Sequence, residues 1–147
     1  MPRPVRSRFG ATVLFLAFLL AGGCASGTPR SVVDPPGGGS TALYSAGVSA
    51  SNLLFLSGVV GSSETGDIGE ATRDALDGIR ERAAAADVTM ADLVQCTVFL
   101  TDIDDYTPMN EAYAGYFPSE PPARTAIAVT AVPASALLEI ACIAVIP

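Results

Sequence analysis

Apolar and polar positions follow regular patterns from Leu43 to the C-terminus, and these patterns predict one small domain. Two apolar runs joined at Ser49–Asn52 indicate a β-hairpin, and three later runs have the length and composition of strands. The expected strands are Tyr44–Val48, Leu53–Val60, Leu93–Leu100, Thr125–Thr130 and Leu137–Ile146, the last two separated by a turn at Pro133.

Two segments between these strands predict helices. Over Glu70–Ala86 the small and apolar side chains repeat on one face, and four charged residues (Arg73, Asp77, Arg80, Glu81) fall on the face toward water. A second helix over Asp104–Phe117 begins with two aspartates, and its Pro108 is tolerable because it lies in about the first turn.

The resulting order, β-β-α-β-α-β-β, predicts a single α+β domain with two helices on one face of a sheet. The last strand is apolar on both of its sides, from Ile140 to Val145. We therefore expect the second face of the sheet to be buried by oligomerisation.

The first 23 residues predict a signal peptide. Three arginines precede an apolar run at residues 11–20, which is too short for a comfortable permanent membrane span, and small residues follow. Ala21, Gly22 and Gly23 before Cys24 resemble a bacterial lipobox with Cys24 as the lipidated residue, although Ala21 stands where a larger aliphatic residue is expected. Cleavage at a nearby Ala-x-Ala-like site is the alternative.

Residues 24–42 are rich in Gly, Ser, Pro and Thr and predict a flexible linker. The domain is then expected over 43–147. Together these features predict an exported protein, either a membrane-anchored lipoprotein or a periplasmic or secreted one. Contact with a membrane is expected only through the lipid anchor.

The amino-acid composition excludes several classes of ligand and of catalytic mechanism. The eight basic residues are all arginine, three of them lie before the apolar run, and all 15 acidic residues lie after it. This strongly acidic remainder disfavours nucleic acid as a partner. The absence of histidine and lysine from the sequence excludes Ser-His-Asp and Cys-His catalysis, an ordinary zinc site and a lysine Schiff base.

Cysteines and one arginine stand out among the remaining residues. Cys96 and Cys142 lie in expected strands, where they are either small buried hydrophobes or a disulfide pair. Arg124 follows two prolines and begins an apolar strand, so it can present its planar guanidinium to a carboxylate. A surface or interface ion pair is the other interpretation of Arg124.

An ordered set of short motifs resembles the Rid family of reactive-intermediate deaminases (RidA-like). The resemblance extends from about Leu43 to Ile146. Its motifs are Tyr44, Asn52–Gly58, Thr97–Asp102, Met109–Tyr113, Tyr116–Phe117, Pro122–Arg124 and Glu139–Val145.

This resemblance implies a chorismate-mutase-like fold, a homotrimer with ligand sites between subunits, and hydrolysis of 2-imino or 2-enamino acids to 2-oxo acids and ammonia. It implies no metal or organic cofactor. Arg124 matches the family's anchor for the substrate carboxylate, and Tyr44, Ser57 and Asn110 match its other site positions. Each of these three also has a structural interpretation: Tyr44 as interface packing, Ser57 as a turn former and Asn110 as a buried amide.

Two positions depart from the family pattern. Ala141 stands where deaminating members have a glutamate thought to position the attacking water, and Ala126 replaces a common cysteine. Glu139 lies on the same strand face as Ala141 and either substitutes as the carboxylate through a water or is only structural, and Glu120 is a second candidate substitute. The sequence thus leaves two functions: a deaminase, or a non-catalytic protein that binds a small carboxylic acid in the same cleft.

Overall fold

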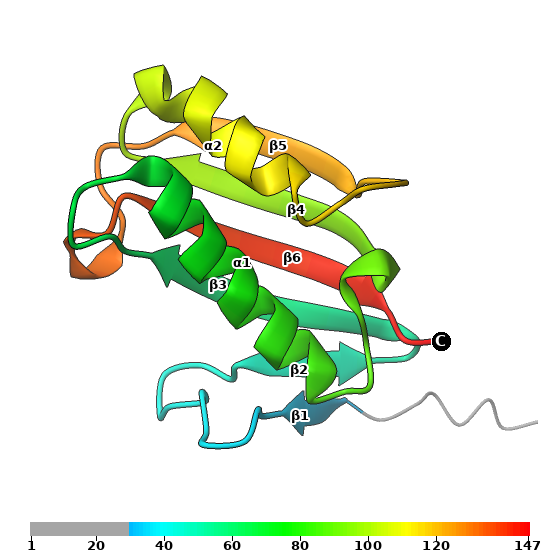
Figure 1. Ribbon diagram of the computed structural model, residues 1–147. Coiled ribbons are helices and arrows are strands. Elements are labelled where there is room, and N and C mark those ends of the chain that lie inside the picture. The colour runs from blue at the N-terminus through cyan, green and yellow to red at the C-terminus, as the bar shows by residue number, and fades with distance from the viewer. Residues whose placement is uncertain (1–29) are drawn as a thin grey trace, which may run out of the picture.

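The computed structural model describes residues 30–147, which form a six-stranded sheet and two helices (Figure 1). Neither helix in this range combines the length and the apolar character that crossing a membrane requires. The elements are β1 (Ser31–Val33), β2 (Gly47–Ala50), β3 (Leu53–Gly61), α1 (Ile68–Ala84), β4 (Leu93–Leu100), α2 (Tyr106–Ala114), β5 (Ala123–Ala128) and β6 (Leu138–Val145).

The strands lie in the order β1-β2-β3-β6-β4-β5. All neighbouring pairs are antiparallel except β4 and β5, which are parallel because α2 connects them. Both helices lie on the same face of the sheet, as Figure 1 shows. The predicted α+β class with two helices on one face is confirmed.

Helix α1 packs closely on β3 because two glycines leave room for the backbones. The Asp67 side chain caps its N-terminus by accepting a hydrogen bond from the Glu70 backbone. A Cβ at Gly61 would collide with the Ala71 carbonyl, and a Cβ at Gly78 would come within 2.7 Å of Val59 Cγ1. This close approach brings the C-terminal end of α1 beside the middle of β3.

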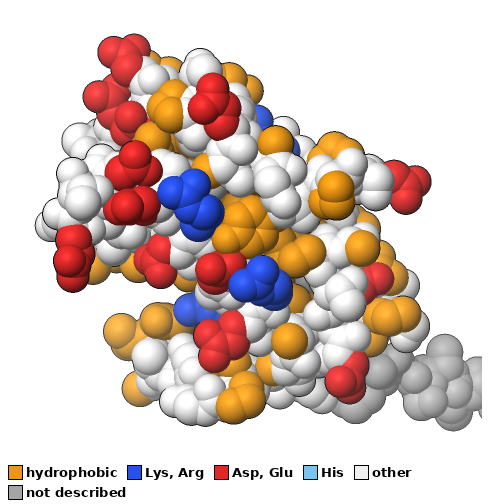
Figure 2. Space-filling model, in the orientation of Figure 1, with side chains coloured by type: hydrophobic (Ala, Val, Ile, Leu, Met, Phe, Trp, Pro, Cys, Tyr) orange, Lys and Arg blue, Asp and Glu red, His pale blue; other side chains and the backbone are white. Residues whose placement is uncertain are grey.

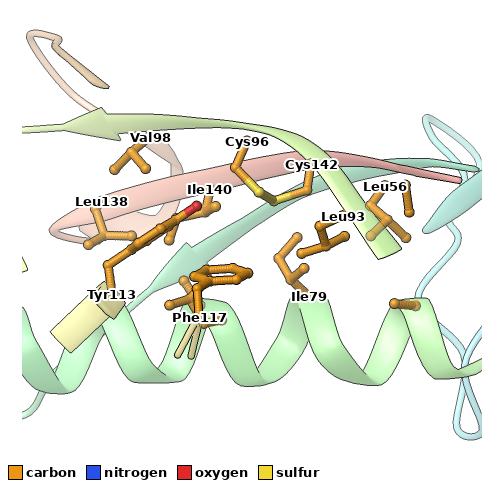
Figure 3. Packing of buried hydrophobic residues seen from close by; sticks show 14 of the residues in the cluster. Leu56, Ile79, Leu93, Cys96, Val98, Tyr113, Phe117, Leu138, Ile140 and Cys142 are labelled. Atoms are coloured by element: carbon orange, nitrogen blue, oxygen red, sulfur yellow. A yellow bond between two sulfur atoms is a disulfide. The ribbon is translucent and has the colours of Figure 1, made fainter. Parts of the chain in front are cut away.

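The hydrophobic core lies between the helices and this face of the sheet (Figure 3). Alternate residues of β6, namely Leu138, Ile140, Cys142 and Ala144, are buried there. Cys96 and Cys142 are paired across β4 and β6 and form a disulfide, with both side chains buried. Of the two interpretations that the sequence left for these cysteines, the structure shows the disulfide.

The opposite face of the sheet has no helix over it. Phe55, Val94 and Ile127 are each more than 40% exposed although they are large and apolar. Ala141 and Ile143 from β6 line a shallow depression on the same face, together with Phe55 and Thr97. The protomer therefore leaves an apolar sheet surface facing outward.

The structure differs from the sequence prediction near the N-terminus. The signal peptide and Cys24 lie outside the described residues, but the linker expected over 24–42 includes β1, whose Val32 and Val33 pair with β2. These β-branched residues favour a strand despite the Gly-rich and Pro-rich sequence that follows them. Tyr44, expected in a strand, lies in the loop before β2.

Helix boundaries also differ by a few residues. The second helix begins at Tyr106, after a short 3-10 turn at Ile103–Asp105, and ends at Ala114 instead of Phe117. Pro108 is consequently the third residue of the helix. The first four backbone N–H groups of a helix have no partner within it, so a proline at this position breaks no helical hydrogen bond.

Candidate functional site

Arg124 projects from the edge strand β5 onto the side of the sheet covered by α2. Its Nη2 donates a hydrogen bond of 2.6 Å to Asn110 Oδ1, and its guanidinium carbon lies 4.6 Å from the centre of the Tyr113 ring. Tyr106 and Met109, also from α2, make longer contacts with the guanidinium. We call these five residues the Arg124 cluster.

The Arg124 cluster holds its arginine without neutralising it. Pro121 and Pro122 restrict the backbone just before β5, and Asn110 and Tyr113 orient the guanidinium from one side. No carboxylate of residues 30–147 lies within ion-pair distance of Arg124; the one salt bridge in that range joins Arg80 and Asp77. The guanidinium is thus preorganised for an external anion, beside a pocket of about 400 Å³.

Tyr113 forms the buried floor of this cluster. Its side chain is 5% exposed and packs on Phe117, with the ring centres 4.8 Å apart. Burial raises the pKa of the Tyr113 hydroxyl to about 12, and the nearby Arg124 charge lowers it only in part. The hydroxyl is therefore neutral at physiological pH, and it has no hydrogen-bond partner among the described residues.

Ser57 lies on β3, at the bulge where the pairing with β6 changes register. Its Oγ donates a 2.7 Å hydrogen bond to the Ser45 carbonyl, and its backbone N–H donates to Ala46. These bonds fix the loop that carries Tyr44. Because the hydroxyl proton of Ser57 is already donated, Oγ can act toward a ligand only as an acceptor.

A cleft of about 560 Å³ opens beside this bulge, and we call it the Ser57 cleft. Tyr44, which is half-exposed, lines it together with Ser57 and Glu139. The full lining is Tyr44, Ser57, Gly58, Val59, Val60, Arg82, Pro133, Ala134 and Glu139. Three of the residues predicted from the sequence thus lie in one cleft.

Glu139 reaches the Ser57 cleft by lying against the backbone of Gly58. A Cβ at Gly58 would collide with the Glu139 carboxylate, so only glycine leaves the space that this side chain occupies. Glu139 is half-buried and belongs to the sheet face opposite the helices. Ala141 lies two residues further along the same face, in the apolar depression outside the cleft.

Arg82 lines the same cleft, although sequence analysis did not select it. Its Nη1 donates to the carbonyls of Ser57 and Gly58 at 2.9 and 3.2 Å. The sequence signal was Gly78, one helical turn earlier, because its missing side chain brings α1 onto β3 and so places Arg82 at the bulge.

The two groups of site residues lie apart within one protomer. Ser57 is on β3, Arg124 is on β5, and strands β6 and β4 lie between them. At the usual spacing of strands, this separation is about 14 Å. The structure therefore brings Tyr44, Ser57 and Glu139 together and Asn110 and Arg124 together, but it does not join the two groups. Glu120 is exposed before Pro121, outside the Ser57 cleft.

The surface of the protein carries charges of both signs. On the face shown in Figure 2, acidic side chains are widespread and the arginines are interspersed among them. Within residues 30–147, no cluster of three or more His, Cys, Asp or Glu side chains is arranged to hold a metal ion.

Comparison with known proteins gives consistent matches over this domain. The family model described as Endoribonuclease L-PSP matches residues 38–146. A RutC family protein of Pyrococcus horikoshii is 38% identical over 107 residues, which cover 69% of this chain and 85% of that protein. Reactive Intermediate Deaminase A, chloroplastic, of Arabidopsis thaliana is 39% identical over 107 residues, covering 69% of this chain and 57% of that protein.

A solved structure shares the fold. Escherichia coli TdcF with bound serine superimposes with a TM-score of 0.69 at 27% identity, covering 78% of this chain and 98% of that one. This likeness confirms the chorismate-mutase-like fold class that the sequence resemblance implied.

Proposed function

The chain belongs to the Endoribonuclease L-PSP family, also called the Rid family, and from this membership and its site we propose that it hydrolyses reactive 2-imino and 2-enamino acids. The products are the 2-oxo acid and ammonia. The observation that carries the proposal is the preorganised guanidinium of Arg124, which is oriented by Asn110 and Tyr113 and has no carboxylate partner in the described chain. Such a group suits the carboxylate of a small acid.

A complete site requires a second copy of the chain. The separation of about 14 Å between β3 and β5 is too long for one three-carbon or four-carbon acid to bridge. A neighbouring subunit that places its Arg124 cluster beside the Ser57 cleft would join the two groups. We propose that this happens in a homotrimer, whose association also covers the apolar sheet surface around Phe55 and Ile127.

Within the joined site, each side chain has a chemical task. Arg124 holds the substrate carboxylate, and Ser57 Oγ accepts a hydrogen bond from the imine nitrogen. The Tyr44 hydroxyl lies where it can orient water or substrate. Glu139 is the one carboxylate that lines the cleft, and we assign it the role of general base.

The proposed reaction consumes one water. Glu139 accepts a proton from water as its oxygen bonds to C2 of the imine and the C=N bond becomes a single bond. Glu139 passes this proton to the nitrogen, and the new C2 hydroxyl gives up its proton, which also goes to the nitrogen. The C–N bond then breaks with its electron pair leaving on nitrogen as ammonia, and C2 becomes a carbonyl, so one imine and one water give one 2-oxo acid and one ammonia.

One observation favours the second function, a protein that binds a small carboxylic acid without turnover. Ala141 cannot accept a proton, and it stands where deaminating relatives are expected to carry a glutamate. If Glu139 does not reach the attacking water, Arg124 still provides an anchor for the acid. The serine bound to E. coli TdcF shows that a protein of this fold holds a small amino acid.

RNA is not supported as a substrate, despite the description of the family model. The described chain has five arginines and no lysine or histidine, against 15 acidic residues. Phosphate backbones are bound by clustered positive charge, and such an acidic domain repels them.

We also propose that the protein acts outside the cytoplasm, as a lipoprotein anchored at Cys24 or as a soluble exported protein. The signal-like residues 1–23 motivate this proposal, and the Cys96–Cys142 disulfide supports it because such bonds persist in oxidising compartments. Mass spectrometry of the mature N-terminus tests it. A lipidated Cys24 indicates the anchored form, an unmodified cleaved end indicates secretion, and an intact Met1 would contradict export.

An amino-acid oxidase that produces 2-iminopropanoate in the assay mixture provides the test of hydrolysis. Semicarbazide traps free imine in competition with the protein, so catalysis appears as less trapped product and faster release of ammonia. We expect acceleration by the wild-type protein and its loss in Arg124→Ala with the oligomer intact. A wild-type rate equal to the protein-free rate would overturn the deaminase proposal.

Two further measurements separate the functions. Ala141→Glu restores the family's second carboxylate, and a large gain in turnover would show that the natural protein lacks an effective base. Calorimetry with 2-oxobutanoate tests binding alone, for which we expect a weak site that Arg124→Ala abolishes. Equal binding by that variant would contradict both functions, because both require Arg124 as the anchor.

A further inference from the structure

Arg82 is a second arginine at the candidate site, and the proposed reaction does not use it. It is half-buried in the last turn of α1, where a positive charge is also favourable to the helix dipole. Neither of the other arginines on α1 lines the Ser57 cleft: Arg73 is exposed, and Arg80 pairs with Asp77 on the helix surface. The position of Arg82 thus differs from that of an ordinary surface arginine.

The hydrogen bonds of Arg82 orient its guanidinium and leave one side of it open. Nη1 carries two N–H groups, and these serve the carbonyls of Ser57 and Gly58. Among residues 30–147, neither Nε nor Nη2 of Arg82 donates a hydrogen bond, and no carboxylate lies within ion-pair distance. The Nε–Nη2 edge is the side of a guanidinium that accepts a carboxylate through two parallel hydrogen bonds.

Two groups of opposite charge contact the Gly58 backbone in this cleft. Arg82 bonds the Gly58 carbonyl, whereas the Glu139 carboxylate occupies the place that a Cβ of Gly58 would take. A ligand with a second carboxylate at its far end would match this arrangement, with its reacting carbon toward Glu139 and its distal carboxylate on Arg82. The cleft volume of about 560 Å³ leaves room for such a molecule.

We infer that Arg82 selects dicarboxylic substrates, namely 2-imino acids of four or five carbons with a second carboxylate at the far end. This inference rests on the proposed function, in which Arg124 from a neighbouring subunit holds the first carboxylate. Arg82 then holds the second carboxylate and is a specificity-determining residue of the same site.

Binding of stable 2-oxo acids tests this inference without requiring turnover. Calorimetry compares 2-oxoglutarate, which has two carboxylates, with 2-oxobutanoate, which has one. We expect wild-type protein to bind 2-oxoglutarate about tenfold more tightly, since a charge-assisted contact is worth about one decade in affinity. Arg82→Gln should remove that preference and leave 2-oxobutanoate affinity within about twofold.

The choice of variants separates charge from structure. Arg82→Gln removes the charge, while Arg82→Lys keeps the charge on a long side chain that can still donate hydrogen bonds to the Ser57 and Gly58 carbonyls, so it should retain part of the preference. Arg80→Gln is the matched control, because it removes a positive charge from the same helix outside the cleft and should change neither affinity.

Three results would overturn the inference: no preference in the wild-type protein, equal weakening of both ligands in Arg82→Gln, or equal loss in Arg80→Gln. Equal weakening in Arg82→Gln would mean that Arg82 only supports the β3 bulge or balances Glu139. The outcome is separate from that of the ammonia assay. If imine hydrolysis fails but the preference persists in an Arg82-dependent form, the deaminase proposal falls and the ligand class stands.

Discussion

The Arg124 cluster and the Ser57 cleft are built in different ways. In the cluster, side chains from α2 hold the guanidinium of Arg124: an amide, an aromatic ring and a thioether. In the cleft, the important contacts involve the backbone, since Arg82 bonds two carbonyls, Ser57 bonds a third, and Glu139 occupies space left by Gly58. The first half is thus specified by residue identity, and the second by close approach of the chain.

This difference predicts that the two halves will respond differently to substitution. A side-chain partner in the Arg124 cluster can be changed with a local effect on one arginine. In the Ser57 cleft, a single added methyl group displaces a carboxylate. The disulfide lies between the halves: Cys142 is on β6 beside β3, and Cys96 is on β4 beside β5. It therefore joins the strand pair of one half to the strand pair of the other.

The largest expected effect is on stability, from loss of this disulfide. It closes a loop with a sequence separation of 46 residues. The chain-entropy relation for a loop of this size gives a loss of about 4 kcal/mol in the free energy of unfolding. Urea unfolding of Cys96→Ala/Cys142→Ala against the wild-type protein measures it. Wild-type protein unfolded with dithiothreitol serves as the control, and unchanged midpoints in both would contradict a formed bond.

The next effect concerns the Arg124 cluster and compares two substitutions of Asn110. Asn110→Asp places a carboxylate against the guanidinium and occupies the anchor, so we expect 2-oxobutanoate affinity to fall about 100-fold. Asn110→Ala removes only an orienting hydrogen bond and should cost about tenfold. Calorimetry measures both. An Asp variant that binds better than the Ala variant would mean that Arg124 is not the anchor.

The sequence predicted more of the Arg124 cluster than of the Ser57 cleft, because the first depends on residue identity and the second on close approach of the backbone. Arg124 and Asn110 are recognisable by residue type and by their place beside predicted elements. Their direct contact follows from the parallel pairing of β5 with β4 and from the position of α2 over it. Arg82 and Gly58 act through backbone approach, which depends on how closely α1 and β6 pack on β3. Periodicity indicates which face of α1 is buried, but not that Gly78 draws the helix close enough for Arg82 to reach the bulge.

The fold shows a similar division. The strand at Leu93–Leu100 was predicted to the residue, because its apolar run is bounded by polar residues. The strand at Ser31–Val33 was missed, since only three residues form it and pairing with β2 stabilises it. This strand is stabilised by pairing with β2, and the sequence of the strand itself does not indicate that pairing.

A smaller effect tests the Ser57 cleft. Gly58→Ala should turn the Glu139 carboxylate out of its place and lower kcat for imine hydrolysis about tenfold. This is less than the roughly 100-fold or more that a general base typically contributes, because such imines also hydrolyse without a catalyst. Gly115→Ala is the matched control in the other half, because its Cβ would meet nothing closer than the Ala112 carbonyl at 3.4 Å. Equal losses in both variants would remove the distinction between the halves.

A double variant sharpens this result. If the methyl group at Gly58 acts by displacing Glu139, then Glu139→Gln should lose as much activity as Gly58→Ala, and the combination should lose no more. Additive losses would show that Gly58→Ala disturbs the bulge itself, and that Glu139 has a task independent of its position against Gly58.

The smallest expected effect has the opposite sign and concerns the floor of the Arg124 cluster. The Tyr113 hydroxyl is buried with no hydrogen-bond partner in the described chain, which costs free energy in the folded state. Tyr113→Phe removes that cost and keeps the ring under Arg124, so we expect the protein to gain about 1 kcal/mol. Urea unfolding measures the gain, and 2-oxobutanoate affinity should stay within about twofold. Destabilisation instead would show that the hydroxyl finds a partner in the assembled protein, such as a bound water or a neighbouring subunit. In that case the Arg124 cluster would also depend on assembly, and the contrast between the two halves would be smaller than one protomer shows.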